Sequence, residues 1–229
     1  MNQARAVDIA TRIGLDLQEV SAPVISNPVG RVLSGEGVQL PYLVLMLAAM
    51  EYCLYSGRIT VLAPVLLDTV PVETAAVEQF VACVEAACAK GENASPPTLT
   101  KVIPVQFGND ACNPRICLLV LDAQSNVTFI NPRVAESAPD STARMMDGLL
   151  KIRDIERYRV VPCNTHACRA GTDALWAIYF LDAILSRGAT MALESFNVQA
   201  DETILQLLLM TGRLKPSIGK FLLHQAGTR

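Results

Sequence analysis

The stretch RICLLVLDAQSNVTFINP, residues 115–132, decides the fold class of this 229-residue chain. Two short runs rich in β-branched and large apolar residues, 115–122 and 126–131, flank the three-residue loop AQS. Runs of this composition joined by a loop of two to five residues are typical of a β-hairpin. We therefore expect two antiparallel strands here.

More elements are predicted on both sides of this hairpin. Strand-like runs occupy 58–67, 98–107 and 157–163. Apolar residues at helical spacing predict helices over 4–18, 42–57, 72–91, 141–155, 172–186, 201–212 and 215–226. This order predicts an α+β fold, in which a central antiparallel or mixed β-sheet packs on a buried helix, with extra N- and C-terminal helices.

Composition and charge exclude several classes of protein. A hydrophobic fraction of 51% with only 18% charged residues excludes a disordered chain, and it favours burial against a protein partner or a second copy of the chain. A net charge of −3 without basic runs excludes a nucleic-acid partner. The longest apolar stretch, 40–50, is shorter than the roughly 20 residues of a membrane span. No secretory signal is evident, and seven cysteines without disulfide spacing indicate a reducing, intracellular compartment.

The helix predicted over 172–186, TDALWAIYFLDAILS, is apolar on nearly every side, as expected of a helix at the centre of a domain. Thr172 and Asp173 stand at its start. A hydroxyl and a carboxylate are favoured there, by on the order of 1 kcal/mol each, because the first backbone N–H groups lack partners and the dipole is positive. Asp173 is thus interpreted first as a capping residue.

The hairpin and this helix together resemble the adenain and Ulp1-like cysteine proteases of clan CE, over about 70 residues from 115 to 185. In that family a strand begins with His-Trp, the next strand ends in an acidic residue, and a loop with an oxyanion Gln precedes a buried helix that opens with Cys-Gly. Here RICLLVLD, VTFINP and HACRAGTDALWAIYFLDA follow in the same order. The resemblance implies a single domain over 1–229, with a protease-like core at about 98–187, a helical N-terminal segment over 1–97 and a helical C-terminal segment over 188–229.

Carried over position by position, the resemblance implies that the catalytic residues are replaced. The general base falls on Arg115, the orienting acid on Asn131, the oxyanion Gln on or next to His166, and the nucleophile on Asp173. Trp176 keeps the aromatic position of the nucleophile helix. Because arginine cannot accept a proton and a carboxylate cannot replace a thiolate in peptide hydrolysis, a cysteine-protease reaction is not expected.

The replaced catalytic residues predict that the protein is a pseudoenzyme without a cofactor. Its expected function is that of a structural or protein–protein interaction module. The resemblance extends this expectation to viral proteins and pathogen effectors, in the cytoplasm or nucleus of a host cell or in a virion. The former cleft would be lined by Arg115, Asn131, His166, Asp173 and Trp176. The opposite charges of Arg115 and Asp173 suggest a salt bridge across it.

Two alternatives place chemistry on cysteine. Cys168 with His166 could serve an active thiol protease, ubiquitin-like-modifier protease or acyltransferase. A mixed zinc site is the second alternative, although the spacing is not that of a common zinc module. Its ligands would be Cys112, Cys117, Cys163, His166 and Cys168.

Overall fold

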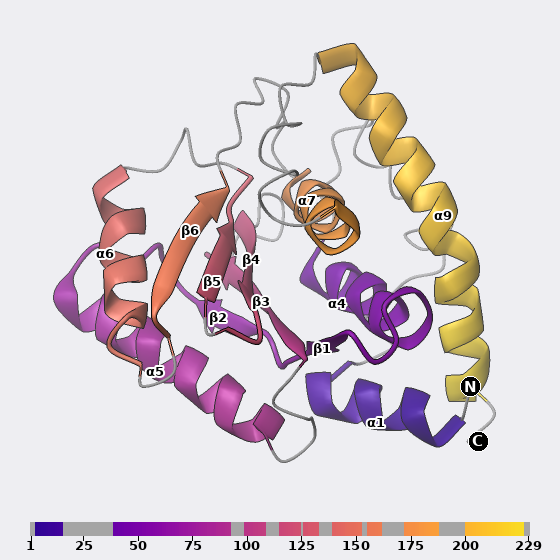
Figure 1. The fold of residues 1–229 in the computed structure, drawn as a ribbon, viewed down its shortest axis with the longest axis horizontal. Coiled ribbons are helices and arrows are strands. Elements are labelled where there is room, and N and C mark those ends of the chain that lie inside the picture. The colour runs from indigo at the N-terminus through magenta and orange to yellow at the C-terminus, as the bar shows by residue number, and fades with distance from the viewer. Residues whose placement is uncertain are drawn as a thin grey trace.

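A mixed β-sheet separates two layers of helices (Figure 1), and the α+β fold class predicted from the sequence is confirmed. The computed structural model describes residues 3–15, 39–92, 99–108, 115–124, 126–132, 139–152, 155–161, 172–187 and 200–226. Its six strands are β1 (Ile59–Val61), β2 (Val65–Leu67), β3 (Thr100–Phe107), β4 (Arg115–Leu121), β5 (Asn126–Ile130) and β6 (Arg157–Val161).

The strand order is β1-β3-β4-β5-β6, and β2 pairs with the same edge of β3 as β1. The predicted hairpin forms: β4 and β5 are antiparallel, with Leu118 opposite Ile130. β3 and β4 are also antiparallel, whereas β1, β2 and β6 pair with their neighbours in parallel. The sheet is therefore mixed.

The run 58–67 forms two short strands instead of one. β1 stops opposite Val102 and β2 starts opposite Val105, so the break in pairing, which contains Pro64, lies across from Ile103 and Pro104. Proline has no N–H to donate to a neighbouring strand. The interruption between β1 and β2 therefore coincides with the one position of β3 that cannot donate.

The helical elements are α1 (Gln3–Ile13), α4 (Leu40–Ala49), a π-helical turn η1 (Met50–Leu54), α5 (Thr74–Glu92), α6 (Pro139–Leu149), α7 (Asp173–Arg187) and α9 (Ala200–Ala226). The segment 1–97, described from the sequence as helical, thus contributes the strands β1 and β2 to the sheet as well as helices. The prediction of two helices in the tail is wrong, because α9 is continuous and contains Pro216. Its C-terminal half packs on α1, α4 and η1, and this packing offsets the hydrogen bond that proline removes.

Each face of the sheet carries its own core, and β4 shows why. Ile116, Leu118 and Val120 point into the core shared with α1, α4, α7 and α9, whereas Cys117 and Leu119 point toward α5 and α6. Successive side chains of a strand alternate between faces. Since both faces are covered, the strand is a continuous apolar run in the sequence.

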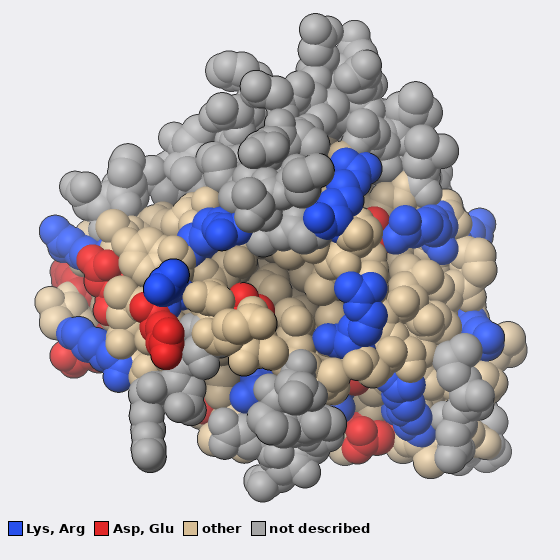
Figure 2. Space-filling view, in the orientation of Figure 1, with Lys and Arg blue, Asp and Glu red and all other residues tan. Residues whose placement is uncertain are grey.

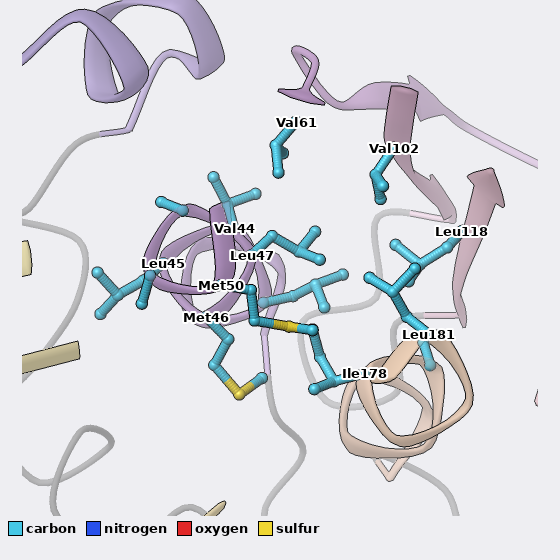
Figure 3. Close-up of a cluster of buried hydrophobic side chains, with 14 of the residues drawn as sticks. Val44, Leu45, Met46, Leu47, Met50, Val61, Val102, Leu118, Ile178 and Leu181 are labelled. Atoms are coloured by element: carbon cyan, nitrogen blue, oxygen red, sulfur yellow. The ribbon is translucent and has the colours of Figure 1, made fainter. Parts of the chain in front are cut away.

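The first core is centred on α4, which is apolar all round and almost fully buried. Figure 3 shows Val44 and Leu47 directed toward Val61 and Val102 of the sheet, and Met50 reaching toward Ile178 of α7. The prediction that the sheet packs on a buried helix is confirmed by α7, of which Asp173–Ile178 are all buried. No helix among the described residues is both long and apolar enough to cross a membrane.

The β1 edge of the sheet is closed by side chains. The N–H of Val61 donates to Glu51 Oε2 at 2.7 Å, and Arg12 Nε donates to the carbonyl of Val61 at 3.0 Å. Arg12 Nη2 also contacts both oxygens of Glu51 at 2.6 Å. An ion pair between α1 and η1 therefore occupies the position that a further strand would take.

Candidate functional site

The first turn of α7 meets the first residues of β4. The backbone N–H groups of Leu175 and Trp176 donate to the carbonyl of Thr172, at 3.0 and 3.1 Å, so Thr172 is the residue at which the helix begins. The next residue, Asp173, is 1% exposed, and its Oδ2 accepts a long hydrogen bond of 3.4 Å from the N–H of Ile116. Asp173 thus lies at the helix start, as expected, and is also tied to the sheet.

Arg115 lies beside this carboxylate. It precedes Ile116, whose N atom is 3.4 Å from Asp173 Oδ2, so the Cα of Arg115 is at most about 6 Å from that oxygen. Arg115 is half-buried at the start of β4. The two positions that the resemblance assigns to base and nucleophile are neighbours. A direct ion pair between their side chains stays a prediction.

Asn131 joins them from the adjacent strand. It follows β5 directly and is 2% exposed. Because Ile130 lies opposite Leu118, the antiparallel register continued by one residue places Asn131 opposite Cys117. The start of β4, the end of β5 and the start of α7 therefore bring Arg115, Asn131 and Asp173 to one end of the sheet.

Trp176 lies one turn into α7 and is 3% exposed. Its ring contacts those of Tyr179 and Phe180, each at a centroid distance of 5.8 Å. Its Nε1 is buried and has no hydrogen-bond acceptor among the described residues. A buried indole N–H ordinarily has an acceptor, and a ligand could provide one here only if the groups that shield Nε1 moved aside.

Of the five residues predicted for the alternative thiol and zinc sites, one is among the described residues. Cys117 is a buried cysteine that forms no disulfide, on the α5 and α6 side of β4. The described ranges contain no cluster of three His, Cys, Asp or Glu that could hold a metal ion. The other positions of the alternative thiol and zinc sites lie outside the described residues; these are Cys112, Cys163, His166 and Cys168.

A second polar cluster lies at the other end of α7. The hydroxyl of Tyr55 donates to Asp182 Oδ1 at 2.5 Å, and Arg213 of α9 forms an ion pair with the same oxygen. Burial, followed by the hydrogen bond to Asp182, raises the pKa of Tyr55 to about 12. The cluster fixes α7 between Tyr55 and α9, so that α7 is held near both of its ends, by Asp173 and by Asp182.

Sequence reasoning missed Glu51, although the signal was present. It is the first charged residue after the apolar stretch 40–50, and it is 4% exposed. Burial raises the pKa of its carboxyl group, and the charge of Arg12 is the strongest opposing influence. A single acid that ends a buried apolar helix is expected to have a partner, but the identity of that partner depends on the fold.

The described groups of the site are of kinds that suit binding. An arginine, an asparagine and a carboxylate provide hydrogen-bond donors and acceptors and opposite charges, but no thiolate and no base that can activate one. Together with the indole N–H of Trp176, the described groups suit the backbone of a peptide segment.

Comparison with known proteins gives no family assignment. No family model matches the chain, and no curated protein matches it. Among solved structures, the central domain of an uncharacterized protein from Legionella pneumophila is similar at 12% identity and a TM-score of 0.37, covering 70% of this chain and 89% of that one. At that score the match supports no conclusion about fold or function.

Proposed function

We propose that this chain is a catalytically inactive, cysteine-protease-like protein that works as a protein–protein interaction module. The observation that carries the proposal is the hydrogen bond from Ile116 to Asp173, which joins the start of α7 to the residue after Arg115, at the end of the sheet where Asn131 follows β5. Arg115, Asn131 and Asp173 are the positions at which the resembled proteases hold base, orienting acid and nucleophile. All three carry other side chains.

The buried carboxylate supports a structural use of the former nucleophile position. At the start of α7 this carboxylate accepts a hydrogen bond from the N–H of Ile116 in β4, and it lies where the helix dipole favours negative charge. A thiolate at this position would need a neighbouring base to form and to attack. Arg115 remains protonated at any ordinary pH and cannot be that base.

The ligand that fits the site is the extended tail of a partner protein. The resembled proteases act on ubiquitin-like modifiers, whose C-terminal tails are extended, and a module that keeps the fold without the chemistry would retain tail binding. A carbonyl of the tail could accept from Trp176 Nε1, and its terminal carboxylate could meet Arg115. A protein of viral or effector origin belongs to the same proposal.

An activity-based probe tests the proposed lack of catalytic activity. Ubiquitin-like modifiers carrying a C-terminal electrophile should leave the wild type unlabelled at near-neutral pH. The triple variant Arg115→His/Asn131→Asp/Asp173→Cys, shown to be folded by circular dichroism, should be labelled at residue 173, whereas Asp173→Cys alone should react far more slowly.

Labelling of the wild type at Cys168, lost in His166→Ala, would replace the proposal with an active thiol protease, modifier protease or acyltransferase. The binding half is tested by titrating capped tail peptides while the fluorescence of Trp176, the single tryptophan of the chain, is followed. A response that weakens at least about tenfold in Arg115→Glu supports the module. Absence of any response to the tails of the modifier families would overturn tail binding.

A further inference from the structure

The two edges of the sheet differ in how they end. At β1, Glu51 and Arg12 satisfy both backbone groups of Val61. At the opposite edge β5 is the only strand of the described residues that pairs with β6, and Arg157, Tyr158 and Arg159 are exposed. An edge strand with uncovered backbone groups is a template for one more strand. The β6 edge is therefore the side on which the sheet can be extended.

The two faces of β6 differ in charge. Val161 points into the first core, so Arg157 and Arg159, two and four residues earlier, are on that same face. Their Cα atoms are about 7 Å apart along the strand. Neither guanidinium has a hydrogen-bond or ion-pair partner among the described residues. Figure 2 shows Lys and Arg side chains on the near surface over β6, with Asp and Glu side chains beside them.

The acidic groups nearby are on the other face or already bonded. Glu156, two residues before Tyr158, lies on the same face of β6 as Tyr158, and burial followed by the nearby negative charge of Asp147 of α6 raises the pKa of Tyr158. Asp122, across Asn126 from Arg157 in the sheet, accepts hydrogen bonds from backbone and side chain of its own hairpin loop. No carboxylate of the described residues therefore neutralises the two arginines.

We propose that the open edge of β6 binds an extended acidic segment of a partner protein as an added strand. Acidic residues at alternate positions of that segment would lie beside Arg157 and Arg159, and apolar residues between them would contact Tyr158 and half-buried Val160. Backbone hydrogen bonds supply binding, and the alternation of acidic and apolar residues supplies selectivity. A second copy of the chain is disfavoured as the occupant, because pairing β6 with itself would bring arginines together.

This inference does not depend on the cleft of the proposed function, since β6 and the start of α7 use different residues. The probe is a capped seven-residue peptide, EVEVEVE, titrated into the full chain. We expect saturable binding, about tenfold or more weakening for QVQVQVQ, and loss of binding when alternate peptide nitrogens are N-methylated.

The protein variants provide matched controls. Arg157→Glu/Arg159→Glu should abolish binding of EVEVEVE and create binding of the charge-reversed peptide KVKVKVK. Lys215→Glu/Lys220→Glu, which changes the net charge equally at exposed positions of α9, should bind EVEVEVE as the wild type does. Arg115→Glu should also leave this binding intact, which separates the β6 edge from the cleft.

Three results would overturn the inference: no binding of EVEVEVE by the wild type, equal binding of QVQVQVQ, or equal loss in the α9 control, since the last would mean that net charge alone attracts the peptide. A wild-type dimer that dissociates on Arg157→Glu/Arg159→Glu would assign the edge to a second copy and would contradict it as well.

Discussion

Asp173 accepts a hydrogen bond from the backbone N–H of Ile116 at 3.4 Å, and through it the first turn of α7 is joined to the start of β4. Both residues are buried. One carboxylate therefore serves the helix start and the sheet together, at the positions to which the proposed resemblance assigns a nucleophile and a base. The contact connects the fold to the proposed loss of catalysis, and it can be tested by its contribution to stability.

Replacing Asp173 by alanine should destabilise the protein by about 1–3 kcal/mol, because the buried N–H of Ile116 loses its acceptor and the start of α7 loses a favourable charge. Asp173→Asn keeps an acceptor and should cost less than half as much. Urea unfolding at pH 7, followed by the fluorescence of Trp176, gives both values. Equal costs for the two variants would instead mean that the charge of Asp173, and not its acceptor oxygen, supplies the stability.

Arg12→Met should cost about 3–5 kcal/mol at pH 7, because it leaves the buried carboxylate of Glu51 without its counter-charge. The pKa of Glu51 is already raised by burial, and removal of Arg12 should raise it further. A group with a raised pKa in the fold is most stabilising below its unfolded value, here 4.5, and that stability is lost as the pH rises through the folded pKa. The defect should therefore grow from pH 4.5 to pH 7.

Adding Glu51→Gln to Arg12→Met should remove this pH dependence, since the titrating group is gone. Arg144→Met, which removes an exposed arginine bonded to the carbonyl of Val72, is the matched control and should change stability little at either pH. A constant Arg12→Met defect from pH 4.5 to pH 7 would contradict the assignment of Glu51 as the titrating group.

Much of this architecture could be predicted from local patterns, because they reflect local physics. The hairpin 115–131 and the buried helix beginning at Asp173 follow from strand composition, a short loop and a capped apolar segment. The split between β1 and β2 has a local signal that the prediction did not use, Pro64 between the two strands, and it also lies across from Pro104 of β3. The continuous α9 was missed for a different reason: Pro216 predicts a break only until tertiary packing opposes it.

In the candidate site, too, some features could be predicted from the sequence and others depend on the fold. The resemblance placed Arg115, Asn131 and Asp173 together, and the described residues bring these three to one end of the sheet. The partner of Glu51 is 39 positions away on α1, and no spacing rule connects the two. His166 and Cys168 lie outside the described residues, so the predictions for them stay predictions.

Tyr55 should lose its proton only at unusually high pH, and its ionisation should contribute to alkaline denaturation. Its pKa in the fold is about 12, against 10.0 without the fold, so its contribution is fully present below pH 10 and is lost between pH 10 and pH 12. The amount lost is about 1–2 kcal/mol, because solvent near the hydroxyl screens some of the interaction. Tyr55→Phe should therefore lose less stability than the wild type over that interval, as measured by urea unfolding at fixed pH steps.

Asp182→Asn should move the tyrosinate absorbance transition of Tyr55 to lower pH, because the hydrogen bond to Asp182 is one cause of the raised pKa.

Gly148→Ala should destabilise the protein even though alanine is the better helix former by about 1 kcal/mol. A Cβ at position 148 of α6 would lie 2.8 Å from Cγ1 of Val77 and 3.1 Å from Cγ2 of Val81, so α5 would have to shift. Val77→Ala should relieve the closer contact, and the double variant should be more stable than the sum of the two single effects predicts. Gly212→Ala, on the exposed side of α9 with no atom within 4 Å of the added Cβ, should raise stability under the same conditions. If Gly148→Ala stabilised the protein as Gly212→Ala does, the close approach of α5 and α6 would be refuted.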